Sequence, residues 1–159
     1  MQYGFFSGDA SSIAAAFDRG QLTPACCAGT VDVSELMDDP DVWALSEIVA
    51  SHMKVVPPTD HLVELIGGDG DMTHVERASR EWIDLMGAPA ESTLTALVAR
   101  WMQSRRPRWE TRARDSKRPL DEEVGATALA AKERAALELL RLLRKARATK
   151  LDVVRVLVL

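Results

Sequence analysis

The stretch Val153-Val154-Arg155-Val156-Leu157-Val158-Leu159 closes the sequence and decides which fold class the chain favours. A run this rich in β-branched residues predicts a β-strand. Alternate positions place Val154, Val156 and Val158 on one face and Val153, Leu157 and Leu159 on the other. Both faces are therefore apolar apart from Arg155. We expect protein to cover both faces of this strand and other strands to flank it.

The second clear strand candidate lies at the opposite end of the sequence, in Gln2-Tyr3-Gly4-Phe5-Phe6. Between the two ends, apolar spacing and capping signals predict mostly helices. The expected helices begin near Asp9 or Ser11, after Asp39-Pro40, over 60–66, from Thr73 to about 86, over 94–102 and from Pro119 onward, and a short strand could lie at 31–33. The sequence thus predicts a single helix-rich α+β domain over residues 1–159, with a small sheet joining its N- and C-terminal strands.

Size and composition set limits on the class of protein. A chain of 159 residues can bury a sizeable core in one domain. It contains no run of about 18 apolar residues, so we expect no membrane span, and no signal-peptide pattern opens it. The two cysteines are the neighbours Cys26 and Cys27, which are too close in sequence for an ordinary disulfide. These features favour a cytoplasmic protein.

The charge is distributed unevenly along the chain. Residues 1–99 hold 16 acids and 4 bases, whereas residues 100–159 hold 8 acids and 16 bases. The two halves therefore have opposite net charges of −12 and +8. Either the halves fold against one another and neutralise each other, or the protein offers a surface of two signs to a partner.

The order of these features resembles the bacterial YfbM-like family, a domain of unknown function. The resemblance rests on the aromatic strand Tyr3-Gly4-Phe5-Phe6, on Pro58 followed by Leu65-Ile66 and Gly67-Gly68, and on the apolar last helix with its terminal strand. Asp41, Trp43, Leu45 and Pro107-Arg108-Trp109 approximate two further family features, with Arg106 where a tyrosine is expected. The resemblance implies an α+β fold and a bacterial cytoplasmic setting, and it supplies no catalytic residues.

Two clusters could carry chemistry, and in each the structural interpretation is favoured. In Gly67-Gly68-Asp69-Gly70-Asp71, followed by Thr73 and His74, the acids alternate as in a calcium loop, but the twelfth position is Arg80. His52, His61 and His74 with Glu64 do not have the spacing of a metal-ligand set. We therefore predict no metal, no cofactor and no catalytic residue.

The basic segment of residues 100–118 is the candidate binding site. It carries eight bases against Glu110 and Asp115, and Trp109 lies off the apolar stripe of the preceding helix. We expect its polar part, residues 103–118, to be an exposed connection. Arginine and tryptophan dominate the energetics of protein interfaces, and they also occur in nucleic-acid grooves. The predicted partner-binding residues are Arg105, Arg106, Arg108, Trp109, Arg112 and Arg114.

The function predicted from these features is a non-catalytic protein-binding module, of the kind that small bacterial immunity or accessory proteins represent. Its predicted partner is another protein with an acidic surface, and a membrane partner is not expected. Two alternatives stay open at this point. One is a small enzyme or ligand-binding protein that uses a cleft beside residues 67–74. The other, less favoured, is a weak nucleic-acid binder that uses residues 100–118.

Overall fold

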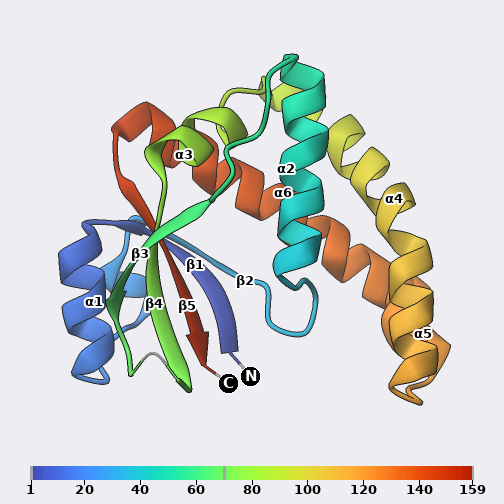
Figure 1. The fold of residues 1–159 in the computed structure, drawn as a ribbon, viewed down its shortest axis with the longest axis horizontal. Helices are drawn as coiled ribbons and strands as arrows, with labels where there is room; N and C mark the ends of the chain where they lie inside the picture. The colour runs from blue at the N-terminus through green and yellow to red at the C-terminus, as the bar shows by residue number, and fades with distance from the viewer. Residues whose placement is uncertain (1, 70, 159) are drawn as a thin grey trace.

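The computed structural model describes residues 2–69 and 71–158, so Gly70 of the glycine-rich stretch and Leu159, which is predicted to belong to the last strand, lie outside the described residues. Its centre is a five-stranded sheet in the order β2-β1-β5-β4-β3 (Figure 1), and every neighbouring pair of strands is antiparallel. The strands are β1 (Gln2–Gly8), β2 (Gly29–Asp32), β3 (Leu62–Gly67), β4 (Thr73–Ala78) and β5 (Asp152–Val158). The predicted α+β class is confirmed.

Helices cover both faces of the sheet. The helix α1 (Ala10–Asp18) packs on one face, while α6 (Ala126–Thr149) packs on the other against β1, β2 and β5 (Figure 1). The remaining helices are α2 (Asp39–Met53), α3 (Arg80–Met86), α4 (Leu94–Asp115), α5 (Leu120–Val124) and the short 3₁₀ turns η1 (Pro24–Cys26) and η2 (Glu91–Thr93). Each of the two layers between sheet and helices holds its own apolar core.

The predicted pairing of the two terminal strands is confirmed. β5 lies in the centre of the sheet between β1 and β4, with Phe5 opposite Arg155 and Tyr3 opposite Leu157. Val154 and Val156 contribute to the core beneath α1, and Val153 contributes to the larger core on the opposite face. Burial on both faces explains why the strand is almost continuously apolar.

The helix predicted over 60–66 is a strand, and so is the first part of the helix predicted from Thr73 to about 86. Leu62–Gly67 forms β3 and Thr73–Ala78 forms β4, and the two strands pair antiparallel as a hairpin. Gly68 makes the turn possible, because its φ is +84° and a Cβ atom there would lie only 2.4 Å from the Thr73 carbonyl oxygen. The next helix, α3, starts only at Arg80, where the Ser79 side chain accepts from the Trp82 N–H.

The connection predicted over residues 103–118 is also wrong, because α4 continues as far as Asp115. Pro107 lies inside this helix, although proline normally removes a backbone hydrogen bond there. The predicted stripe is confirmed in the first half of the helix, where Leu94, Leu97, Val98 and Trp101 are buried. Gly125, with ψ of 164°, then separates α5 from α6. Within residues 2–69 and 71–158, no helix combines the length and the apolar character needed to cross a membrane.

Candidate functional site

The basic face of α4 is anchored on a buried carboxylate at the start of α2. Asp41 is fully buried and accepts hydrogen bonds from the Arg105 Nε–H at 2.9 Å and from the Trp109 indole N–H at 3.1 Å. The Trp101 indole N–H donates to the backbone carbonyl of Asp41 at 2.8 Å. Trp101, Arg105 and Trp109 recur every four residues, so one face of the helix presents all three donors.

Asp38, the N-cap residue of α2, shares these arginines. Its side chain accepts from the Asp41 N–H and lies 2.8 Å from Arg108 Nη2 and 3.4 Å from Arg112 Nη1. A carboxylate loses several kcal/mol of hydration when it is buried, and pairing can offset that cost. The arginines of α4 therefore compensate the acids of α2, as expected if the two halves of the chain neutralise each other.

The ion pairs continue from α4 to α5 and α6. Arg112 Nη2 donates to Glu123 at 2.7 Å, and the buried Lys132 lies 3.5 Å from the same carboxylate. Burial lowers the pKa of Lys132. Burial alone would raise the pKa of Glu123, but the hydrogen bond and charge of Arg112 outweigh it and lower that pKa. The Lys132 ammonium also lies 5.3 Å from the centre of the Trp109 ring, a cation–π distance.

The structure therefore corrects the predicted exposure of the binding residues. Trp109 is fully buried, and Arg105 and Arg112 are engaged in internal ion pairs. Arg108 is half-buried beside Asp38. Arg106 and Arg114 are exposed, and their nearest partners are other residues of α4. Within the described residues, α4 offers neither the exposed tryptophan nor the full set of arginines on which the predicted site depends.

A second polar cluster lies over the central strands. The Tyr3 hydroxyl donates to Asp39 at 2.7 Å, and Arg155 bonds both Asp39 and Glu76. The His61 ring stacks between those of Trp43 and Trp82, with centroids 5.9 and 5.4 Å away. Five segments that are distant in sequence thus meet at the start of α2.

Burial and hydrogen bonding shift the pKa values of several of these groups. Burial raises the pKa of Tyr3 and lowers that of His61, whose Nε2 is buried without a hydrogen-bond partner among the described residues. Burial would raise the pKa of Asp39, but the bonds from Arg155 and Tyr3 lower it. The hollows described below are lined by residues outside this cluster. Its clearest role is to fasten α2 to the sheet.

Residues 67–74, beside which a cleft is expected, lie where β3 ends and β4 begins. The Oδ1 atom of Asp69 accepts from the backbone N–H groups of Asp71, Met72 and Thr73, so the hairpin itself uses this oxygen. Among the described residues, no three His, Cys, Asp or Glu side chains are grouped closely enough to hold a metal ion. The expectations that the protein needs no metal and no cofactor stay predictions.

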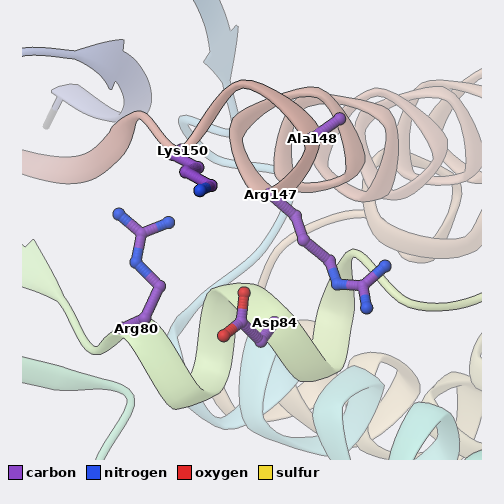
Figure 2. A pocket seen from close by; sticks show the side chains of 5 residues that line it. All are labelled: Arg80, Asp84, Arg147, Ala148 and Lys150. Atoms are coloured by element: carbon purple, nitrogen blue, oxygen red, sulfur yellow. The ribbon is translucent and has the colours of Figure 1, made fainter.

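Three adjoining hollows surround α3. The first, of about 290 Å³, is lined by Met53, Val55, Val56, Pro58, Glu81, Leu85 and Ala88. The second, of about 450 Å³, shares Pro58 and Glu81 with the first and extends to Asp60, Val63 and Arg80. The third, of about 500 Å³, shares Arg80 with the second and is completed by Asp84, Arg147, Ala148 and Lys150 (Figure 2). We call these three hollows together the α3 surface.

The α3 surface changes character from one end to the other. At its first end, Val55 and Val56 are 52% and 89% exposed, and Val63 of the edge strand β3 is 54% exposed. At its other end, three cations face one carboxylate. Exposed apolar side chains with charged side chains at their rim are typical of an interaction surface.

Comparisons with family models, curated proteins and solved structures give no match for this chain. The resemblance to the YfbM-like family, and the setting and function that it implies, therefore stay predictions.

The α3 surface is not among the sites predicted from the sequence. Its residues come from the end of α2, from the loop before β3, from α3 and from the end of α6, and no local pattern links these segments. One available signal is Val55-Val56 followed by Pro57-Pro58, since two prolines make it difficult for adjacent apolar residues to join a helix or a sheet interior.

Proposed function

We propose that this protein is a non-catalytic protein-binding module whose recognition surface is the α3 surface. One observation carries the proposal. Six large hydrophobic side chains are exposed in the part of the chain that the structure describes, and three of them, Val55, Val56 and Val63, line this one surface. Scattered exposed hydrophobic residues are ordinary, whereas their concentration around a hollow favours a binding role.

The electrostatics of the rest of the molecule support this location. Arg105 and Arg112 of α4 are engaged by Asp41 and Glu123, which reduces the positive charge that α4 offers to an external partner. Arg147 and Lys150, in contrast, have no ion-pair or hydrogen-bond partner for their side chains among residues 2–69 and 71–158. The proposed partner is still a protein with acidic groups, but it would bind at the α3 surface instead of at α4.

Binding rather than catalysis is supported by the residues of the α3 surface. Tyr3, Asp39, His61 and Arg155 have perturbed pKa values, but none of them lines it. Ser79, which contributes a hydroxyl there, uses it to cap α3. A cytoplasmic location is part of the proposal, and the free thiols of Cys26 and Cys27 support it.

The test is selection of a random dodecapeptide library, displayed on phage, against the folded protein. Peptides recovered on the parent should bind the double variant Val55→Ser, Val56→Ser at least about tenfold more weakly, since each loses apolar contact area. Leu120→Ser is the matched control, because Leu120 is 51% exposed but lies on α5, outside the α3 surface. Peptides that bind the double variant as well as the parent, or a selection without enrichment, would contradict the proposal.

A further inference from the structure

We infer that the third hollow of the α3 surface, between α3 and the end of α6, binds carboxylate groups of an acidic segment in the partner protein. The inference rests on the proposed function and adds the chemistry of the partner. Arg80, Arg147 and Lys150 line this hollow, and Asp84 is the one acid among its lining residues. The lining residues therefore carry an excess of two positive charges, three against one.

The neighbouring bases of α6 have internal ion-pair or hydrogen-bond partners. Arg141 and Arg144 both pair with Glu91, at 2.7 and 3.5 Å, and Lys145 donates to the Ala28 carbonyl at 3.0 Å. The described residues provide no such partner for the side chains of Arg147 and Lys150. These two cations are thus available to an external anion.

The usual structural explanation for bases at this position is the negative end of a helix dipole. It accounts for Arg147 and Lys150, which lie at the C-terminal end of α6. It does not account for Arg80, which comes from the first turn of α3 and approaches the hollow from the opposite side (Figure 2). In Figure 2, Arg80 and Lys150 extend toward each other, and the Asp84 carboxylate points into the space below them.

Close packing fixes the two walls of the hollow. Gly87 follows α3, and a Cβ atom there would lie 2.7 Å from the Leu143 carbonyl oxygen and 2.9 Å from Arg147 Cβ. Arg80 Nη2 lies 3.5 Å from Asp152 in a half-exposed pair, which orients the guanidinium but contributes little energy. The cations therefore project from a rigid base, and such preorganisation reduces the entropic cost of binding.

The apolar part of the α3 surface identifies the anion as a carboxylate of a polypeptide. Arg80 lines both the cationic hollow and the hollow that contains Val63. A single segment with acidic side chains at one end and apolar side chains at the other can therefore occupy both. Free phosphate would use only the cationic end.

The probe for this inference is a capped pentaglutamate peptide, with capped pentaglutamine as the neutral control. Binding is followed at low salt through the backbone amide signals of the protein in two-dimensional NMR spectra. We expect pentaglutamate to shift the amides of Arg80, Asp84 and Lys150 in a saturable way, and the neutral peptide to leave them in place. The double variant Arg147→Ser, Lys150→Ser should weaken this binding by about tenfold.

The matched control is Arg106→Ser with Arg114→Ser, which removes the same charge from the exposed face of α4. Equal weakening by both double variants would show a general effect of net charge and would overturn the inference. Tighter binding of inorganic phosphate than of pentaglutamate at these amides would also overturn it.

The two proposals fail separately. The variant Val55→Ser, Val56→Ser should keep pentaglutamate binding, because these valines line only the first hollow. If selected peptides bind through the valines while pentaglutamate does not bind, the inference is wrong and the proposed function stands. If pentaglutamate binds while no peptide depends on the valines, the third hollow binds carboxylates, but the proposed function of the whole α3 surface is wrong.

Discussion

The indole N–H of Trp109 donates to the carboxylate of Asp41 at 3.1 Å, and neither side chain is accessible to solvent. The two residues are 68 positions apart, on α4 and α2 respectively. Their contact joins the acidic half of the chain to its basic half. The same carboxylate bonds Arg105, so part of the charge asymmetry of the sequence is neutralised inside the fold.

Neutralising Asp41 should destabilise the domain strongly. Asp41→Asn leaves Arg105 without its buried countercharge, and breaking a buried ion pair costs about 3–5 kcal/mol. Urea unfolding followed by circular dichroism measures the change in free energy. Glu47→Gln, on the exposed side of the same helix, should change it by less than about 0.5 kcal/mol. Equal stabilities of the two variants would show that the Asp41 network contributes nothing.

Removal of β5 should unfold the protein. A chain that ends at Leu151 loses the central strand, including Val153, Val154 and Val156, which are at most 3% exposed. Each such side chain contributes roughly 1.5–3 kcal/mol, against a total stability of about 5–15 kcal/mol. Calorimetry should therefore show no cooperative transition. A truncated chain that melts cooperatively near the temperature of the parent would refute the central position of this strand.

Stability should fall when the pH drops below about 6.5, the ordinary pKa of histidine. Burial lowers the pKa of His61, so the unfolded chain takes up a proton at a pH where the folded protein still resists it. Stability is therefore complete above that pH and decreases toward the lower folded-state pKa. Between pH 5 and 8 most carboxylates stay ionised, which isolates this effect.

The measurement for this prediction is urea unfolding across that pH range in two variants. His61→Phe keeps a ring between Trp43 and Trp82 and should flatten the pH dependence. His52→Phe changes an exposed histidine of α2 and should leave the dependence as in the parent. A slope that survives in the first variant would assign the pH dependence to other groups.

The packing of α3 on α6 should depend on the absence of a side chain at residue 87. Gly87→Ala places a methyl group 2.7 Å from a backbone oxygen, and overpacking of this kind costs about 1–3 kcal/mol. Thermal unfolding provides the measurement, with Ala148→Ser on the exposed wall of the same hollow as the control. An unchanged melting temperature in Gly87→Ala would mean that the two helices are not in close contact.

The terminal strands can be predicted because their signal is local. Val153 to Val158 are mostly β-branched, and a strand apolar on both faces has to be central. Leu62–Gly67 is more difficult, since a short apolar run fits a helix or a strand equally well, and Thr73 with Glu76 has the spacing of a helix cap. Pairing of β4 with β3 on one side and with β5 on the other decides the outcome, and no local sequence pattern predicts this pairing.

The basic segment is difficult to place from sequence for a related reason. Pro107 favours the end of a helix, but Arg105 and Trp109 on either side of it are both bonded to Asp41, which keeps α4 helical. The expectation that Trp109 lies off the apolar stripe is wrong, because α4 continues and Trp101, Arg105 and Trp109, four residues apart, lie on one face of it. This spacing is a local signal that the helix continues. The acceptor cannot be identified from sequence, because Asp41 lies at least 60 positions away.

Hydrogen exchange of the Trp109 indole N–H, followed by NMR in heavy water, tests most directly whether the basic segment belongs to the interior. Exchange of a buried, bonded indole requires opening of the fold, so it should be at least about a thousandfold slower than in an unfolded chain. Asp41→Asn should accelerate it, and the half-buried Trp43 serves as the reference within the same sample. Exchange of Trp109 at the rate of a free indole would show that this part of α4 is exposed to solvent, and it would contradict this account.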